Sequence, residues 1–256
     1  MIDPWNPELY GRFGADRSRP FWDLVALIRP RTGMRIVDLG CGAGGLTLAL
    51  HEHLQASETV GIDSSPTMLA TSAANVRRGV RFAEAHIERF EERGAFDLVF
   101  SNASLQFVGD HVTLFARLVA ALKPGGQLAI HVPANHEHVS QTIAAGVAGE
   151  EPFRSELGGF VRSSPVLRPE QYAVLLHRLG VSEQIVRLQV YGNLLASRDD
   201  VVDWVKGGAL TDYQKRLAPE SFERFVERYR ELLVARLDDE RPYFFPFNRI
   251  LIWAVR

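Results

Sequence analysis

The stretch Arg35-Ile-Val-Asp38-Leu-Gly40-Cys41-Gly42-Ala43-Gly44-Gly45 decides the fold of this chain. An apolar run typical of a buried strand leads into a glycine-rich loop, and a helical pattern begins at Leu46. Glycines let a backbone turn sharply and approach a ligand closely. The stretch therefore predicts a nucleotide-binding loop between a strand and a helix.

The spacing of these glycines does not by itself identify the nucleotide. Gly40-x-Gly42-x-x-Gly45 also satisfies the fingerprint of dinucleotide-binding proteins such as NAD-dependent dehydrogenases. Two residues before the first glycine lies Asp38, whose carboxylate would repel a pyrophosphate and attract an ammonium group. S-adenosylmethionine (SAM) carries an ammonium group and no phosphate, so the residues favour SAM over NAD. Alternatively, Asp38 only anchors the backbone amides of its own loop.

The whole chain has the composition of an ordinary globular protein. Its 256 residues, 46% hydrophobic and 23% charged, suit one large domain or a domain with a cap. The net charge of −2, from 29 basic and 31 acidic residues, gives no reason to expect nucleic acid as a partner. The single cysteine is consistent with a reducing compartment, and no signal-peptide pattern or membrane-length apolar run occurs. We expect a cytoplasmic protein without a membrane segment, and we infer no obligate protein partner.

Strand-like and helical stretches alternate between residues 35 and 133. The expected strands are Arg35–Asp38, Thr59–Ile62, Val80–Ala83, Phe96–Ser101 and Gln127–Val132, and the expected helices are Leu46–Leu54, Thr67–Asn75 and Val112–Leu122. This alternation predicts a parallel sheet with helices on both faces.

The pattern changes on either side of this core. We divide the chain into an N-terminal helical segment (1–30, with a helix over Arg17–Arg29), a Rossmann-like nucleotide-binding core (31–133), a helical cap insertion (134–181) and a C-terminal part (182–256). The C-terminal part is predicted to contain the strands Ser182–Tyr191 and Phe244–Val255 and the cap helices Asp199–Lys206 and Pro219–Leu237.

Four candidate site segments follow strands and would meet at the carboxyl edge of the sheet. The first is the glycine loop. The second is Asp63, which comes 63 − 44 = 19 residues after Gly44 and suits a carboxylate that accepts both ribose hydroxyls, although it could simply cap a helix. The others are Glu84-Ala85-His86-Ile87 and Asn102-Ala-Ser-Leu-Gln106-Phe107.

Together with the turn Leu122-Lys-Pro-Gly-Gly126, these motifs resemble the class I SAM-dependent methyltransferases from Arg35 to about Val132. The resemblance implies an α/β, Rossmann-like sheet that is mainly parallel with an antiparallel last strand, a helical cap, and SAM as the cofactor. It also implies a set of cofactor-binding residues: Asp38, Gly40, Cys41, Gly42, Asp63, Ser64, Met68, Ala85, His86, Ile87 and Asn102. His86 departs from the family pattern, which often has an acid there, so either its ring nitrogen or only its backbone would contact the adenine.

Segments outside this core are similar to bacterial trans-aconitate 2-methyltransferases. They are Trp5-Asn-Pro-Glu-Leu-Tyr10, Phe13, Arg17-Ser-Arg19-Pro20, Gly61-Ile-Asp-Ser-Ser-Pro66, Asn102-Ala-Ser-Leu-Gln106, Asp203-Trp-Val205 and Phe247-Asn-Arg249. This similarity implies SAM-dependent esterification of one carboxylate of trans-aconitate, a small-molecule polycarboxylate. Two alternatives are a methyltransferase of the same fold for another carboxylic acid or a quinone precursor, and a SAM-binding protein without transfer activity.

Esterification of a carboxylate places modest demands on the protein. The oxygen nucleophile, with a reference pKa near ~4, is already ionised at neutral pH, so we assign no catalytic acid or base. A polycarboxylate calls for guanidinium groups and hydrogen-bond donors. The predicted substrate-binding residues are Tyr10, Arg17, Arg19, Asn135, Tyr191 and Arg249. The simpler interpretation of Arg249 is a partly buried strand arginine paired with an acid.

The eight histidines show no spacing typical of a metal site, and we expect no metal. His131 is interpreted as a strand residue near the edge of the sheet.

Overall fold

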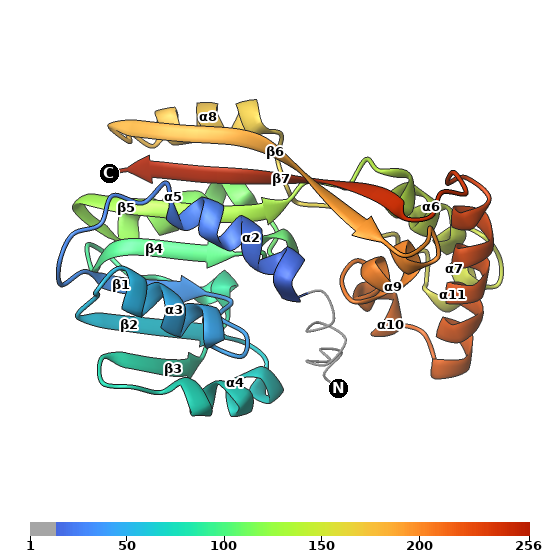
Figure 1. Ribbon diagram of the computed structural model, residues 1–256, viewed down its shortest axis with the longest axis horizontal. Helices are drawn as coiled ribbons and strands as arrows, with labels where there is room; N and C mark the ends of the chain where they lie inside the picture. Colours follow the sequence, from blue (N-terminus) through green and yellow to red (C-terminus); the bar gives the residue numbers. More distant parts are fainter. Residues whose placement is uncertain (1–13) are drawn as a thin grey trace. The chain divides into compact units, whose positions relative to one another are not determined.

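A seven-stranded sheet forms the core of the computed structural model, which describes residues 14–256, with side chains described from Arg19 onward (Figure 1). The strand order is β3-β2-β1-β4-β5-β7-β6. The strands are β1 (Arg35–Leu39), β2 (Glu58–Asp63), β3 (Val80–Glu84), β4 (Phe96–Asn102), β5 (Leu122–Pro133), β6 (Glu183–Leu195) and β7 (Tyr243–Val255). The first five strands pair in parallel and β7 runs antiparallel to β5. The predicted mainly parallel sheet with an antiparallel last strand is confirmed.

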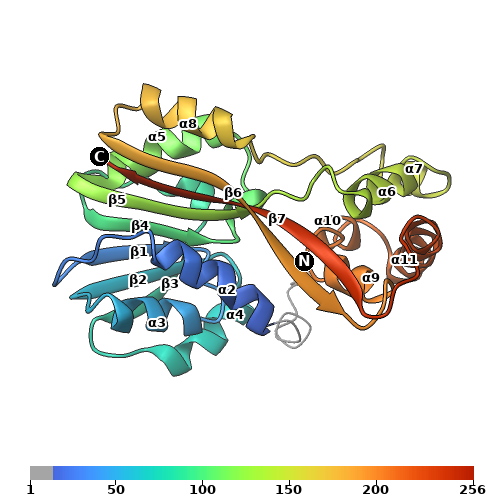
Figure 2. The same ribbon diagram turned by 45° about the horizontal axis from the view of Figure 1, so that its top comes forward.

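Helices cover both faces of this sheet (Figure 2). Helices α2 (Gly14–Val25) and α3 (Gly45–His53) lie on one face, and α5 (His111–Ala121) and α8 (Pro169–Arg178) lie on the other. The first face holds one buried apolar cluster, made of Phe21, Leu24, Val25, Ile28, Met34, Ile36, Leu50, Leu54, Leu98, Phe100, Ala129, Leu251 and Trp253. Alternation along each strand aims these side chains at α2 and α3. None of the described helices is long and apolar enough to cross a membrane.

The helix predicted over Arg17–Arg29 begins and ends earlier than the sequence suggested. Helix α2 ends at Val25, and the next residues form tighter turns in which the backbone N–H of Ile28 donates to the carbonyl of Val25 at 3.0 Å. The apolar spacing continues through Ile28 because this turn still buries its side chain in the cluster. Periodicity therefore placed the buried face correctly but not the helix end.

The predicted Lys-Pro-Gly-Gly turn lies inside β5 as an irregularity. Phe96 pairs with Leu122, whereas Leu98 pairs with Gln127, so β5 uses (127 − 122) − (98 − 96) = 3 more residues than β4 over this span. Gly125 takes a φ of 71° there, a left-handed conformation that favours glycine. The strand thus begins five residues before the predicted Gln127.

Two compact units divide the described chain. The first, which we call the sheet unit, holds residues 15–133, 165–189 and 249–256, and the second, the helical unit, holds residues 134–164 and 190–248. The unit boundaries at 189 and 248 fall within β6 and β7, so both strands contribute to both units. The four segments drawn from sequence pattern stay a prediction.

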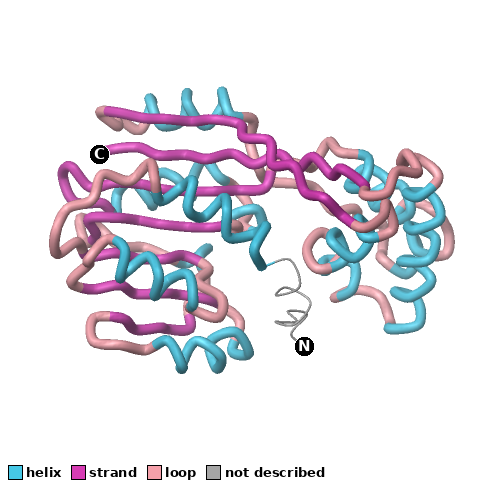
Figure 3. The backbone as a smooth tube through the Cα atoms, viewed as in Figure 1, coloured by secondary structure: helices cyan, strands magenta, loops and turns pink. Residues whose placement is uncertain are grey.

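The helical unit, in which most of the chain is helix or loop (Figure 3), has its own apolar core. Its helices are α6 (Val139–Ala148), α7 (Phe153–Glu156), α9 (Asp200–Lys206), α10 (Thr211–Gln214) and α11 (Pro219–Val234). Helix α11 is amphipathic, and its buried Tyr229 hydroxyl donates to the carbonyl oxygen of Ser140 at 2.9 Å. Trp204 packs against Phe245 and Phe247. The helices predicted over Asp199–Lys206 and Pro219–Leu237 are present as α9 and α11, and their role as a cap stays a prediction.

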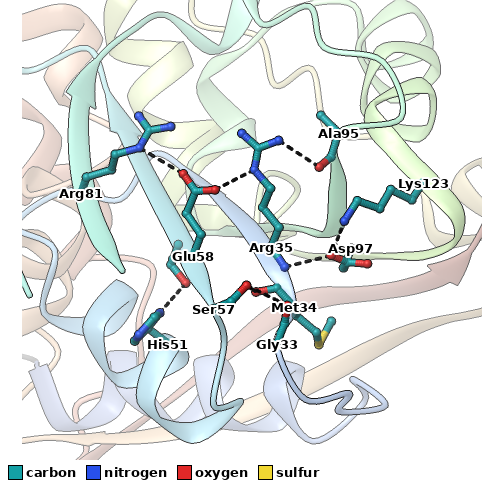
Figure 4. Close-up of polar contacts among 11 residues, drawn as sticks. Gly33, Met34, Arg35, His51, Ser57, Glu58, Arg81, Ala95, Asp97 and Lys123 are labelled. Atoms are coloured by element: carbon teal, nitrogen blue, oxygen red, sulfur yellow. Dashed lines mark hydrogen bonds and ion pairs between the residues drawn. The ribbon is translucent and has the colours of Figure 1, made fainter. Parts of the chain in front are cut away.

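Ion pairs tie together the amino ends of the five parallel strands (Figure 4). Glu58 on β2 accepts from Arg35 on β1 at 2.8 Å and from Arg81 on β3 at 3.3 Å. Asp97 on β4 accepts from the Arg35 backbone N–H at 2.9 Å and from the Lys123 ammonium on β5 at 2.7 Å. These charges are partly exposed and each pair contributes only about 0.2–1 kcal/mol. Their mutual pairing gives this edge a structural role.

The buried hydrogen bonds of Gln127 predict that its replacement lowers the free energy of unfolding. Its amide accepts from the Arg29 N–H and the Trp253 indole N–H, both at 2.9 Å, and donates to the Arg29 carbonyl at 2.8 Å. Gln127→Met keeps the volume and leaves all three groups without that partner, so we expect a loss of about 2–4 kcal/mol in urea unfolding. Gln214→Met, at an exposed position, is the matched control. A loss below about 0.5 kcal/mol for Gln127→Met would contradict this role.

Candidate functional site

The candidate site lies at the carboxyl ends of the parallel strands, where the strand order reverses. Chain connections leave β1 toward β2 and β3 on one side, whereas β4 and β5 lie on the other. Ligands of open parallel sheets bind outside such a switch point. The glycine loop follows β1 there, and Asn102 ends β4.

The glycine loop is held in a conformation that few other residues adopt. Gly40, Gly42 and Gly44 have φ angles of 77°, 54° and 78°. The backbone N–H groups of Gly40 and Cys41 both donate to the carbonyl of Ile62, at 2.8 and 3.0 Å. A Cβ atom at Gly40 would lie 2.3 Å from the Cβ of Ser104, whereas one at Gly42 would meet nothing within 4 Å. Gly40 therefore serves packing, and Gly42 leaves open space in which a ligand can approach the backbone.

Asp63 fastens the loop to the next helix. One carboxylate oxygen accepts from the Gly42 N–H at 2.8 Å, and the other accepts from the Ser65 N–H at 2.9 Å, just before α4 (Pro66–Ser72). The residue that caps α4 is Ser65, whose hydroxyl accepts from the Met68 N–H at 3.2 Å, so the helix-cap interpretation of Asp63 is wrong. Each oxygen still has a further lone pair for another donor. Binding of ribose hydroxyls by Asp63 stays a prediction.

Asp38 is a buried carboxylate with one hydroxyl partner. It is 4% exposed and accepts from the Thr47 hydroxyl of α3 at 2.6 Å, so among the described residues its carboxylate bonds to this side chain and not to the loop amides. Burial raises the pKa of Asp38 to about 7, against the Thr47 hydrogen bond, and the nearby Asp63 raises it further. A bound cation would offset this desolvation. The buried carboxylate is thus consistent with the predicted contact to the ammonium group of SAM, which stays a prediction.

The thiol of Cys41 is not activated. It is half-buried, and burial together with the charges of Asp38 and Asp63 raises its pKa above the ordinary value. Thiolate is the reactive form, so this environment disfavours a nucleophilic role for Cys41.

The predicted adenine-side residues lie around the ends of β2 and β3. Met68 is buried on α4, Ser64 is exposed, and the Ala85 N–H donates to the carbonyl of Asp63 at 3.0 Å. The His86 side chain is exposed, whereas Ile87 is buried with its Cδ1 3.6 Å from a Cβ built on Gly40. The structure thus brings Ile87 to the glycine loop, and the binding roles of all these residues stay predictions.

A polar chain across three strands was missed by sequence reasoning. His131 is fully buried in β5 between β4 and β7, and the prediction of a position near the sheet edge was wrong. Its Nδ1 lies 2.7 Å from the Asn102 Oδ1, and its Nε2 lies 3.1 Å from a terminal nitrogen of Arg249. These three residues share the α2 face of the sheet with Asp38, by strand alternation. The sequence did hold one signal for this chain of contacts: Asn102 and His131 are polar residues near the carboxyl ends of two predicted strands, which pair in the structure.

The six predicted substrate-binding residues separate into three groups. Tyr10 lies outside the described residues, and so does the side chain of Arg17. Arg19 is exposed and Arg249 is 5% exposed, both in the sheet unit. Asn135 and Tyr191 are buried in the helical unit. The Asn135 Oδ1 accepts from the Asn248 N–H at 3.1 Å, and its amide nitrogen has no partner among the described residues.

No group of three or more His, Cys, Asp or Glu side chains able to hold a metal ion occurs within residues 14–256.

Comparisons with known proteins point to methyl transfer. A family model described as a methyltransferase domain matches residues 36–126. The trans-aconitate 2-methyltransferase of Deinococcus radiodurans is 42% identical, covering 98% of each chain, and that of Shigella dysenteriae is 34% identical, covering 100% of this chain and 99% of that protein. A solved phosphoethanolamine N-methyltransferase 2 of Haemonchus contortus, in complex with phosphomonomethylethanolamine and S-adenosylhomocysteine, has a TM-score of 0.57 at 20% identity, covering 93% of this chain and 53% of that one. The last similarity concerns the fold alone.

The two loop glycines predict different costs for the same substitution. Gly42→Ala places a Cβ in open space and pays only for the left-handed backbone, about 1–2 kcal/mol. Gly40→Ala pays this cost and also drives a methyl into Ser104, which adds about 1–3 kcal/mol. Urea unfolding of the two variants measures the difference, and equal stabilities would refute the packing role of Gly40.

The raised pKa of Asp38 predicts a pH-dependent stability difference in the ligand-free protein. Its pKa is 3.8 when unperturbed and about 7 in the folded protein, so the folded state holds this proton more tightly. The stability that this group contributes is present below about pH 4 and is lost as the pH rises through about 7. Asp38→Asn removes the titration and can still accept from Thr47. Its free energy of unfolding relative to the parent should therefore rise from about pH 4 to 7 and then level off.

Unfolding in urea at about pH 4, 6 and 8 checks this expectation. Asp238→Asn, at an exposed position, serves as the control. A pH-independent difference between Asp38→Asn and the parent protein would show that Asp38 titrates in its ordinary range.

Proposed function

Because this chain belongs to the trans-aconitate 2-methyltransferase family of class I SAM-dependent methyltransferases, we propose that it transfers a methyl group from SAM to one carboxylate of trans-aconitate. The observation that carries this proposal is sequence identity of 42% and 34% to such enzymes along essentially the whole chain. That length includes the helical unit, which a shared cofactor site alone gives no reason to retain.

The residues at the switch point fit SAM. The open space at Gly42 admits a ligand against the backbone, and the buried Asp38 would hold its ammonium group. Asp63 would accept from the ribose hydroxyls through its remaining lone pairs while it keeps the loop and α4 in place. When bound, SAM supplies a methyl group on a sulfonium ion, and its transfer to an oxygen leaves S-adenosylhomocysteine.

The acceptor chemistry needs alignment more than proton transfer. An ionised carboxylate attacks directly, so the protein's contribution is to hold the oxygen in line with the methyl group and to exclude water, effects that lower a barrier by roughly 7–11 kcal/mol in favourable cases. His131 supports this interpretation, because burial and the adjacent Arg249 hold its pKa well below the usual range and leave it neutral. Of the predicted substrate-binding arginines, we propose the exposed Arg19 for attracting the polyanion.

We propose a small-molecule acceptor and retain the cytoplasmic location as a prediction from composition. The same holds for the expectation that nucleic acid, membrane and obligate protein partners play no part.

An acceptor panel tests the proposed function. Protein incubated with SAM labelled in the methyl group should transfer label to trans-aconitate well above cis-aconitate or citrate, and a simple phenol should receive none. Thermal unfolding should shift upward with SAM or S-adenosylhomocysteine and not with NAD, because a ligand that binds only the folded state stabilises it. Labelling of the phenol in place of trans-aconitate would reject the assigned acceptor, and stabilisation by NAD would reject the cofactor.

A further inference from the structure

The hydrogen bonds of Arg249, His131 and Asn102 fix one another's direction. A guanidinium has only donors, so the His131 Nε2 that it approaches at 3.1 Å must be the bare, accepting nitrogen. The proton of the neutral ring then lies on Nδ1, which donates to the Asn102 Oδ1 at 2.7 Å. With Nδ1 facing Asn102, the amide must turn its oxygen toward the ring, because only the oxygen can accept the Nδ1 proton.

These hydrogen bonds also determine what the amide nitrogen of Asn102 can do. With its Oδ1 committed to His131, Asn102 presents its Nδ2 group, which carries two N–H donors and has no partner among the described residues. Asn102 is the last residue of β4 and is only partly buried, at the edge where the glycine loop lies. It can therefore donate to an oxygen acceptor at this edge.

We propose that Arg249 and His131 are positioning residues that set Asn102 as a donor to a carboxylate bound at the end of β4. This inference rests on the proposed function, because both the amino-acid part of SAM and the polycarboxylate acceptor carry such a group. It also revises the sequence-based role of Arg249. The arginine acts through His131, from within the sheet, and the atom that meets the ligand is the amide nitrogen of Asn102.

Burial supports this division of roles. Arg249 is 5% exposed and His131 is fully buried, whereas Asn102 is only partly covered. Arg249 and His131 also lie on neighbouring strands, with Arg249 paired to Pro133 and His131 paired to Leu251. Burying a guanidinium is costly, and here part of its donor capacity is used to hold a neutral imidazole in one tautomer.

Nuclear magnetic resonance of the unmodified protein tests the first step. Long-range proton–nitrogen spectra of the histidine rings, with His131 assigned from the signals missing in His131→Gln, should show a neutral ring protonated on Nδ1 from about pH 6 to 8. In Arg249→Met the same ring should lose this single tautomer. An Nε2-protonated or cationic ring in the unmodified protein would overturn the proposal. Arg89→Met, an exposed arginine of the same unit, is the matched control and should leave the spectrum unchanged.

An isosteric variant tests the second step. Asn102→Asp keeps the acceptor for His131, removes the donor and adds a negative charge, so the ring should stay protonated on Nδ1 while carboxylate recognition falls by roughly 10- to 100-fold. Calorimetry with S-adenosylhomocysteine reports on the carboxylate of the methyl donor, and the KM for trans-aconitate reports on the acceptor. Weakening of either one identifies the source of the carboxylate. Unchanged values in both would overturn the proposal.

A double-mutant cycle separates positioning from direct contact. If Arg249 acts through Asn102, then Arg249→Met and Asn102→Ala should lower the affected parameter to a similar extent, and the double variant should lose no more than the larger single loss. Losses that multiply would show that Arg249 meets the ligand itself and would overturn its positioning role. If Arg249→Met fails to fold, Arg249→Lys takes its place in the cycle. Because lysine keeps a shorter donor, the affected parameter in this variant should lie between the values of the unmodified protein and of Asn102→Ala.

The failure of this inference is distinguishable from failure of the proposed function. If the unmodified protein does not methylate trans-aconitate, the histidine spectra and the S-adenosylhomocysteine titrations still decide the roles of Arg249 and Asn102. In that case an unchanged titration in Asn102→Asp would overturn the inference.

Discussion

The conformation of the loop after β1 is the constraint on which the site depends. Three glycines there take left-handed backbone angles, and the loop is fastened from outside by the Ile62 carbonyl and the Asp63 carboxylate. The Ile62 carbonyl and the Asp63 carboxylate both lie at the end of β2, so the pairing of β1 with β2 places these acceptors next to the loop. The same pairing brings Asp63 beside the loop and leaves Asp38 buried beneath it. The loop thus obtains its shape from the sheet and offers an open face at Gly42.

The two edges of the sheet handle charge in different ways. At the amino edge, Arg35, Glu58, Arg81, Asp97 and Lys123 neutralise one another in partly exposed ion pairs. At the carboxyl edge, the Asp38 carboxylate accepts from the Thr47 hydroxyl and has no cationic partner among the described residues, and its pKa is raised to about 7 because burial penalises the charge. A buried carboxylate in this state gains from a cationic ligand. The contrast explains why one edge is structural and the other suits the binding of a charged molecule.

Much of the sheet unit could be predicted from the sequence, because its signals are local. Alternation of apolar strands and helices, glycines at a tight turn and an acid at the end of β2 each depend on residues close together in the chain. Element ends were less accurate. Helix α2 ends at Val25 and β5 begins at Leu122, because a tightened turn and a glycine bulge interrupt regular geometry without changing the apolar spacing. The residues that bind at the loop were proposed through similarity, and their roles stay predictions.

By itself, the sequence determined the succession of strands and helices in the parallel part of the sheet, the loop after β1 and the family. Each of these depends on contiguous motifs or on sequence identity to relatives along the whole chain. Only the tertiary structure decided what the polar residues of the strand ends do. Asn102, His131 and Arg249 are separated by 29 and 118 residues along the chain and meet only because β4, β5 and β7 pair. Direction in a hydrogen bond depends on which partner faces each atom, and that information exists only once the strands are side by side.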